Sequence, residues 1–259
     1  MLLPPKAFAH VPALTGKIID PEKSFFRRIR ERLGELDRAA QANGWPANWR
    51  LPDEAREAAR RELLAEHQGD LWVFAYGSLM WDPGFHIVEI RTATLQGYHR
   101  SFCLKSEIGR GSADKPALMA ALDVEGSCQA LAFRIPEASV EHETKLLCMR
   151  EMLMGAYMPV LVPVDTPQGP LKAVAFLINR SSNRYVRLDL EETARLIATG
   201  RGIRGTCLEY LENLAERLDL LGLADPDITA LRLRVRRLID PHTQPLGPHD
   251  AVGVPQAKL

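Results

Sequence analysis

The chain has 259 residues, of which 46% are hydrophobic and 25% are charged, a composition typical of one globular domain with appendages. Its 33 basic residues balance its 33 acidic residues, so the sequence favours neither nucleic acid nor a membrane surface as a partner. The four cysteines and seven histidines are scattered without the spacing of a metal site or a disulfide framework, so we expect neither.

The first part of the chain, residues 1–70, is predicted to be a helical extension of the main domain. Residues 1–6 lack the pattern of a signal peptide, and no stretch is apolar enough to span a bilayer, so we expect a cytoplasmic protein. Apolar side chains recur with helical spacing at positions 25, 29, 33 and 36, which predicts a helix from residue 21 to residue 43. A second helix is predicted from about residue 52, and we expect the extension to cover one side of the main domain.

The main domain is predicted to span residues 71–239, and its first half is dominated by strands. A short apolar run at residues 71–76 precedes a glycine, which is typical of a buried strand. Glu125-Gly126 is predicted to form a hairpin turn between two strands. The predicted strands are at residues 88–95, 98–105, 117–124 and 129–135.

The second half of the main domain is predicted to contain more helix. A helix over residues 136–154 precedes two strands, and three helices follow, two of which end at Gly200 and Gly222. Strands that come first, with short connections, predict an α+β fold with an antiparallel or mixed sheet. A tail at residues 240–259, rich in Pro, Gly and His, is predicted to be disordered. The two strands are expected at residues 157–164 and 171–178, and the three helices at 190–199, 208–221 and 227–239.

One candidate site is the loop at residues 76–79, where the chain leaves the first strand through Gly77. Glycine allows successive backbone N–H groups to point outward and form a cup for a carboxylate or an oxyanion. A plain strand-to-turn exit explains the same residues and is the commoner outcome for such a motif alone. Ser78 lies outside any Gly-x-Ser-x-Gly motif, so we do not expect it to be a nucleophile.

A second candidate is the pair Arg150-Glu151, the only charged residues in an apolar window from residue 146 to residue 154. On a helix, Glu151 shares a face with Leu147 and Met154, where its carboxylate would lose hydration. Burial and a nearby helix C-terminus both raise the pKa of a carboxyl toward the range of a general acid–base. A structural ion pair, or an exposed glutamate on an outward-facing side of the helix, explains the same spacing equally well.

The order of these motifs resembles that of the bacterial ChaC-type γ-glutamylcyclotransferases. The resemblance extends from about residue 71 to residue 238 and is most specific in two blocks, residues 73–81 and residues 150–157. The first reads Val-Phe-Ala-Tyr-Gly-Ser-Leu-Met-Trp, and the second includes Arg150-Glu151-Met152 and Gly155-Ala156-Tyr157. Supporting blocks begin at Gly97-Tyr98-His99-Arg100 and Leu208-Glu209-Tyr210-Leu211.

The resemblance implies a small mixed barrel with attached helices, no cofactor, and cleavage of glutathione to 5-oxoproline and cysteinylglycine. It further implies that Glu151 is the catalytic acid–base and that the loop after the first strand holds the γ-glutamyl group. Tyr157 is expected either to line the same pocket or to be a core tyrosine. The residues expected to bind substrate are Val73, Phe74, Ala75, Tyr76, Gly77, Ser78, Leu79 and Tyr157.

Three alternatives remain open at this level. The enzyme could act on other γ-glutamyl amines or dipeptides, or the chain could be a non-catalytic γ-glutamyl-binding regulator. The loop at residues 76–79 could bind either the substrate carboxylate or the tetrahedral oxyanion. Arg110, Arg201 and Arg204 are candidates for the glycyl carboxylate of glutathione, and each of them also suits a surface or ion-pair role.

Overall fold

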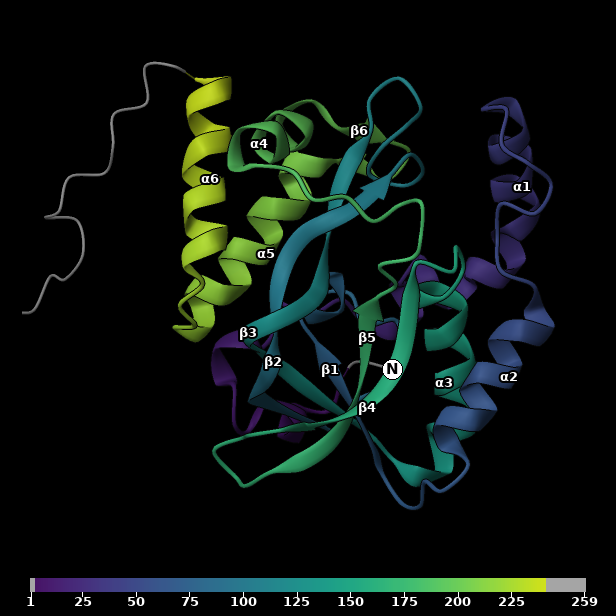
Figure 1. The fold of residues 1–259 in the computed structure, drawn as a ribbon. Coiled ribbons are helices and arrows are strands. Elements are labelled where there is room, and N and C mark those ends of the chain that lie inside the picture. The colour runs from purple at the N-terminus through teal and green to yellow at the C-terminus, as the bar shows by residue number, and fades with distance from the viewer. Residues whose placement is uncertain (1–2, 241–259) are drawn as a thin grey trace, which may run out of the picture.

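The computed structural model describes residues 3–240, and its centre is a mixed sheet flanked by helices (Figure 1). The sheet has five strands in the order β2-β3-β1-β5-β4. Strand β1 pairs antiparallel with β3 and parallel with β5. The bounds of the strands are β1 (Leu71–Ala75), β2 (Glu89–Ser106), β3 (Ala117–Ile135), β4 (Tyr157–Val164) and β5 (Leu171–Ile178). The predicted α+β class with a mixed sheet is confirmed.

The sheet curls until its two edges approach each other. Thr94 of edge strand β2 forms an antiparallel bridge with Asp165, which directly follows edge strand β4. The two backbone N–H···O distances of this bridge are 2.8 and 2.9 Å. A twisted sheet that meets its own edge forms a barrel and leaves fewer backbone groups unpaired. The small mixed barrel implied by the family resemblance is therefore confirmed.

Strands β2 and β3 correct one prediction from the sequence. Each is a single long strand, and Glu125-Gly126 is not a hairpin turn. Gln96 pairs with Ser127 and Tyr98 pairs with Val124, so Glu125-Gly126 forms a bulge opposite Gly97. The φ angles of Glu125 and Gly126 are 76° and 72°, a left-handed conformation that suits a bulge as well as a two-residue turn. The dipeptide alone does not distinguish the two.

Three helices at the C-terminal end of the domain lie within one residue of their predicted bounds. Capping boxes begin the first two, formed by Asp189 with Glu192 and by Thr206 with Glu209. Gly222, with a φ of 64°, ends the second. These helices are α4 (Leu190–Thr199), α5 (Cys207–Leu221) and α6 (Pro226–Ile239).

The N-terminal extension forms less regular helix than predicted. The segment from residue 21 begins as two 3-10 helices, Pro21–Lys23 and Phe26–Arg32, before α1 (Leu33–Ala42). Arg28 has non-helical angles of −104° and 16°, which interrupts the predicted continuous helix. Helix α2 (Asp53–Leu64) follows, and both α1 and α2 lie on the same side of the sheet as α3 (Glu137–Glu151) (Figure 1).

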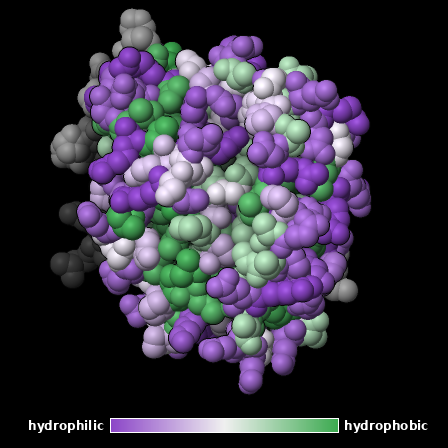
Figure 2. Space-filling model, turned by 45° about the vertical axis from the view of Figure 1, so that its right-hand side comes forward, coloured by the Kyte–Doolittle hydropathy of each residue, from purple (hydrophilic) through white to green (hydrophobic). Residues whose placement is uncertain are grey.

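Figure 2 brings that side of the molecule forward. Apolar surface gathers toward the middle of the face, and hydrophilic side chains dominate its rim. Within residues 3–240, no helix combines the length and the apolarity needed to cross a bilayer. The predicted disordered tail lies, apart from its first residue, outside the described residues.

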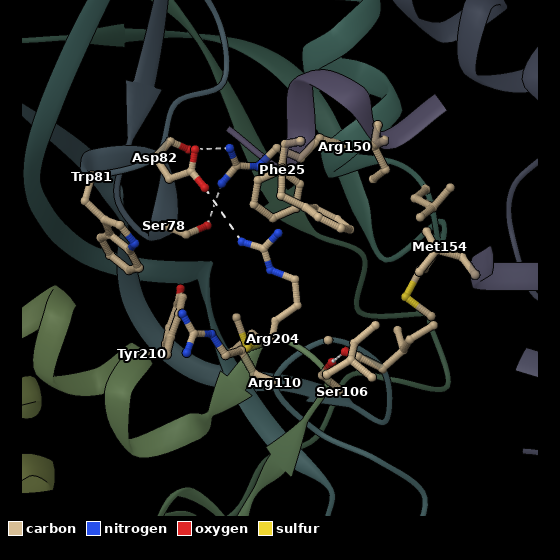
Figure 3. Close-up of a pocket in the computed structure, with 18 residues that line it drawn as sticks. Phe25, Ser78, Trp81, Asp82, Ser106, Arg110, Arg150, Met154, Arg204 and Tyr210 are labelled. Atoms are coloured by element: carbon tan, nitrogen blue, oxygen red, sulfur yellow. Dashed lines mark hydrogen bonds and ion pairs between the residues drawn. The ribbon is translucent and has the colours of Figure 1, made fainter. Parts of the chain in front are cut away.

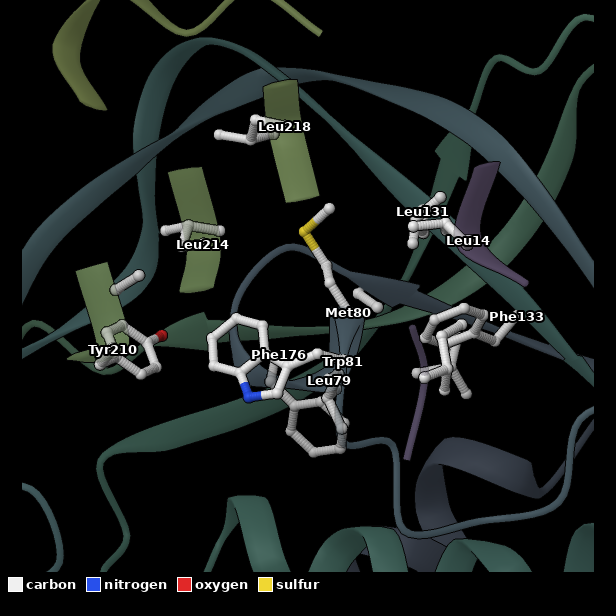
Figure 4. Close-up of a cluster of buried hydrophobic side chains, with 14 of the residues drawn as sticks. Leu14, Leu79, Met80, Trp81, Leu131, Phe133, Phe176, Tyr210, Leu214 and Leu218 are labelled. Carbon is white, nitrogen blue, oxygen red and sulfur yellow. The ribbon is translucent and has the colours of Figure 1, made fainter. Parts of the chain in front are cut away.

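The main core fixes the chain that leaves β1. Met80 has no exposed surface and Leu79 is 4% exposed. Figure 4 shows Met80 and Trp81 facing Leu214 and Leu218 of helix α5. Burying large apolar side chains on both sides of a loop restricts its motion, because any displacement would open a cavity. The loop after β1 is thus held by packing at its C-terminal end.

Candidate active site

The residues singled out at the loop and at Glu151 meet around one cavity of ≈ 130 Å³. Three parts of the fold supply them: the exit of β1, the C-terminal end of α3, and the start of β4. The cavity is lined by Tyr76, Gly77, Ser78, Leu79, Glu151 and Tyr157, together with residues such as Tyr210 and Arg150. Residues separated by about 75 positions in the chain therefore share one pocket.

Glu151 is the last residue of α3, and its side chain is 13% exposed. Burial raises the pKa of its carboxyl above the ordinary value of 4.5. The adjacent Arg150, whose Nε lies 2.7 Å from Glu151 Oε1, opposes that shift, and the charge of Asp82 adds to it. The net effect is a raised pKa, which suits a group that both accepts and donates a proton near neutral pH.

The loop after β1 presents several free backbone donors. Among the hydrogen bonds of the described residues, the N–H groups of Gly77, Ser78 and Leu79 have no protein acceptor. The carbonyl groups of Gly77 and Ser78 instead accept from Met80 and Asp82, both at 2.9 Å, and close a short turn. Consecutive N–H groups left free by such a turn form a site for negative charge.

Gly77 allows a close approach that no other residue type would. A Cβ built at this position would lie 2.8 Å from the hydroxyl oxygen of Tyr210. Tyr210 is itself 2% exposed and packs edge-to-face against Trp81 and Phe102. The glycine therefore lets the loop pack directly on the tyrosine that forms the floor of the cavity.

Arg150 holds the same loop from the side of α3, a role that reasoning from the sequence missed. One of its terminal nitrogens donates to Ser78 Oγ at 2.7 Å, and the other donates to the carbonyl groups of Asp82 and Pro83. The Ser78 hydroxyl is thus an acceptor from a guanidinium. The one available signal was that a second charged residue stood beside Glu151 in an apolar window.

Arg100, on β2, fixes the start of the loop at Tyr76. It is 3% exposed, and its Nε donates to the carbonyl oxygen of Tyr76 at 2.7 Å. Its other nitrogens donate to the Gln129 carbonyl at 2.7 Å and to the carboxylate of Asp225, the N-cap of α6. The position of Tyr76 is therefore tied to the packing of the C-terminal helix.

We expect Arg100→Met to destabilise the fold by about 3 kcal/mol, because it leaves the carbonyl oxygens of Tyr76 and Gln129 and the partly buried Asp225 carboxylate without their donor. Asp225→Asn keeps an N-cap side chain for α6, and Arg100 keeps its two carbonyl acceptors, so this variant should cost less, about 1 kcal/mol. Urea unfolding of both variants measures the two values. Equal losses would contradict a special role for the guanidinium.

The phenol groups at the cavity are donors to the backbone. Tyr76 donates to the Phe176 carbonyl at 2.6 Å, and Tyr157 donates to the Ala120 carbonyl at 2.8 Å. Burial, reinforced by the charge of Glu151, raises the pKa of both phenols well above the ordinary value. Both therefore remain protonated and neutral at physiological pH.

A second cavity of ≈ 200 Å³, which we call the outer cavity, shares part of its lining with the first; Figure 3 shows the residues that line it. Both are lined by Ser78, Arg150 and Tyr210, so the two cavities are neighbours on either side of these side chains. The outer cavity is also lined by Arg110 and Arg204. Of the three arginines considered for a carboxylate, Arg201 is exposed and does not line either cavity.

The strand residues expected to bind substrate lie elsewhere. Val73, Phe74 and Ala75 have no exposed surface and line neither cavity. Their side chains belong to two apolar clusters on either side of the sheet. Through β1 they set the position of the loop that follows. Among residues 3–240, no three His, Cys, Asp or Glu side chains gather in a way that could hold a metal ion.

Comparison with known proteins relates the chain to one family. The model of the ChaC-like protein family matches residues 71–238. A glutathione-specific γ-glutamylcyclotransferase from Escherichia coli K12 is 35% identical over 193 residues, which cover 74% of this chain and 84% of the relative. Human glutathione-specific γ-glutamylcyclotransferase 1 is also 35% identical, over 59% of this chain and 71% of the relative.

The fold has a counterpart among solved structures. A crystal structure of a γ-glutamylcyclotransferase specific to glutathione from yeast superposes with a TM-score of 0.62. The alignment covers 68% of this chain and 100% of the yeast chain, at 21% identity. At that identity the likeness concerns the fold alone.

Proposed function

The chain belongs to the ChaC-like protein family, and we propose that it is a γ-glutamylcyclotransferase that cleaves glutathione to 5-oxoproline and cysteinylglycine. The observation that carries the proposal is one shared cavity, lined both by the buried carboxyl of Glu151 and by the loop with free N–H groups. The names of the relatives supply the substrate class.

The reaction is intramolecular, so the protein's task is to fold the substrate and move protons. The α-amine of the γ-glutamyl group attacks its own γ-carbonyl carbon and closes a five-membered ring. The bond from that carbon to the cysteinyl nitrogen then breaks, and no water is consumed. A cavity of only ≈ 130 Å³ favours the folded conformation of the γ-glutamyl group over an extended one.

Glu151 is the proposed acid–base. At neutral pH the substrate amine is an ammonium ion. The Glu151 carboxylate must therefore accept a proton from it before the amine can attack. The same carboxyl then donates that proton to the departing cysteinyl nitrogen. The attacking nitrogen loses a second proton as the lactam forms, and the released cysteinyl amine takes up that proton as an ammonium. Both bond changes need only proton transfer, so we propose that no cofactor takes part.

The loop is the proposed cradle for negative charge. Its free N–H groups at Gly77, Ser78 and Leu79 suit either the α-carboxylate of the substrate or the oxyanion of the tetrahedral intermediate. A donor aimed at developing charge contributes about 3 kcal/mol to transition-state stabilisation. Arg150 and Arg100 support this role, because they fix the loop from two sides.

A release assay tests the proposal. Purified full-length protein incubated with glutathione should yield equal amounts of 5-oxoproline and cysteinylglycine, measured by chromatography. Faster turnover of γ-glutamylalanine than of glutathione would favour the alternative of a cyclotransferase for other γ-glutamyl dipeptides. Thermal stabilisation by glutathione without any product would favour a binding protein instead.

A binding protein is disfavoured on physical grounds. A buried carboxylate costs free energy, and a protein that only binds its ligand gains nothing from that cost. Glu151 is such a group. The four cysteines are all buried and free, which supports our further proposal that the protein works in a reducing compartment such as the cytoplasm.

The pH profile provides a further prediction. Because Glu151 must begin as a carboxylate, kcat/KM should fall on the acid side as pH drops through its raised pKa. The midpoint of this fall is expected above 4.5, the ordinary value for glutamate. Initial rates from pH 4 to pH 9 in constant ionic strength measure it. A flat acid side down to pH 4.5 would argue against Glu151 as the base.

A further inference from the structure

The outer wall of the outer cavity comes from the N-terminal extension. Phe25, Phe26, Ile29 and Leu36 all line this cavity, whereas the match to the family model begins only at residue 71. Phe26 also reaches the inner cavity, but Phe25 does not. The extension therefore contributes to the pocket itself, in addition to covering one side of the domain.

The aromatic pair contacts a guanidinium that points into the cavity. The Cζ atom of Arg204 lies 4.2 Å from the ring centroid of Phe25 and 4.4 Å from that of Phe26. Figure 3 shows the Arg204 side chain reaching across the cavity toward Asp82 and Ser78, with Phe25 beside it. Such cation–π contacts fix the plane of a guanidinium and leave its N–H edge available.

Arg204 keeps donor capacity for a ligand. Its nearest carboxylate oxygen, Asp82 Oδ2, lies 3.7 Å away, beyond normal hydrogen-bond length. Burial, together with repulsion from Arg150, Arg110 and Arg32, lowers its pKa to about 10, so it remains charged at neutral pH. An anion placed here would relieve this excess of positive charge.

The aromatic pair is held against the helix that carries Glu151. Arg27, next to Phe26, donates to Glu143 of α3 at 2.9 Å. Glu143 is 2% exposed and also binds His86 at 2.9 Å, and His86 in turn lies 3.2 Å from Glu22. These polar contacts involve Glu22 and Arg27, which stand on either side of Phe25 and Phe26 in the chain, and they fix the two rings relative to helix α3, which carries Glu151.

We propose that Phe25 and Phe26 are specificity-determining positioning residues, which hold Arg204 so that it binds a carboxylate on the departing amine of the substrate. This inference rests on the proposed function. If the γ-glutamyl group occupies the inner cavity, the departing peptide extends into the outer one. Its terminal carboxylate would meet Arg204 there. The ligand class is thus a γ-glutamyl peptide that ends in a free carboxylate.

The test compares glutathione with its glycine-amide analogue, which lacks only the terminal charge. For the wild type, kcat/KM should favour glutathione by about tenfold to a hundredfold, the range expected for a hydrogen bond to a charged group. Arg204→Gln should reduce that ratio to near one, mainly through the KM for glutathione. Phe25→Leu should lower it in the same direction, and Phe25→Tyr should retain it.

A double-mutant cycle separates positioning from simple packing. If Phe25 acts through Arg204, adding Phe25→Leu to Arg204→Gln should not lower the ratio further. Arg201 and Arg204 belong to one small hairpin, formed by β6 (Arg201–Gly202) and β7 (Gly205–Thr206). Arg201 lies outside both cavities, so Arg201→Gln is the matched control and should leave the ratio unchanged. A Phe25→Leu variant that slows both substrates equally would overturn the inference, and so would a wild-type ratio near one.

The outcomes also separate this inference from the proposed function. Release of 5-oxoproline from both substrates at equal kcat/KM would refute the carboxylate site and leave the cyclotransferase activity intact. No release from either substrate would refute the proposed function itself. Should Phe25→Leu fail to fold, the Arg204→Gln ratio still decides whether the carboxylate is bound there.

Discussion

Glu151→Gln should lower the turnover of glutathione by about 10²–10⁴-fold, while the protein melts at the same temperature or a higher one. The loss follows from removing the group proposed to carry the proton from the attacking amine to the departing nitrogen. The gain in stability follows from the raised pKa of the carboxyl. A raised pKa means that the folded protein holds the neutral form better than the charged one.

The sign of the stability effect follows from proton linkage. The folded state binds more protons at Glu151 than the unfolded state does between the ordinary value of 4.5 and the raised pKa. The stability associated with the protonated carboxyl is therefore complete below about 4.5 and is lost as pH rises through the folded pKa. Glutamine is neutral at every pH, so the variant should not show this loss.

Glu137→Gln provides the matched control. It changes an exposed glutamate at the opposite end of α3 and should leave turnover unchanged. Rates come from the 5-oxoproline assay, and melting temperatures at pH 5 and pH 8 come from circular dichroism. Near-normal turnover by Glu151→Gln would remove Glu151 from the mechanism, and a marked loss of stability would indicate a structural ion pair with Arg150 instead.

Much of the fold was predictable because its signals are local. The C-terminal helices begin with side chains that cap their own backbone, as Asp189 and Thr206 do, and Gly222 ends α5 in a left-handed conformation. Strand β1 was predictable from an apolar run before a glycine. Each of these features depends on residues within a few positions of one another.

The predictions that were wrong or incomplete concern features that depend on residues far apart in the chain. Whether Glu125-Gly126 turns the chain or bulges depends on its partner Gly97, nearly 30 residues earlier, and local sequence carries no record of that pairing. Phe25 was assigned to a helical stripe that covers the domain. Its contact with Arg204 joins positions 179 residues apart, a distance that no local pattern records.

The candidate site was predicted in part for the same reason. Spacing alone left Glu151 undecided between an acid–base and an ion pair, and the structure contains both features, since Arg150 binds the carboxylate while burial still raises its pKa. The family resemblance selected the loop at residues 76–79. Arg100 lies in one of the supporting blocks of the resemblance, and nothing in the local sequence indicates its contact with the Tyr76 carbonyl.

The second large effect is expected at Gly77. A Cβ there would lie 2.8 Å from the Tyr210 hydroxyl, closer than real side chains approach, so Gly77→Ala must displace either the loop or the tyrosine. Tyr210 is confined by Trp81 and Phe102, so most of the displacement should fall on the loop. A shift of about 1 Å in such a positioning element costs about 10²-fold in turnover.

A second substitution distinguishes this collision from a general loss of flexibility. Tyr210→Phe removes the oxygen that the new methyl group would strike, so the Gly77→Ala, Tyr210→Phe double variant should recover about tenfold of the lost turnover. Tyr210→Phe alone keeps the ring in the core and measures the cost of losing the hydroxyl. If the double variant is no more active than Gly77→Ala, then Gly77 is required for its backbone conformation and not for the space that it leaves beside Tyr210. Because the loop's free N–H groups are the proposed anion site, this pair of variants also measures how closely their placement controls the reaction.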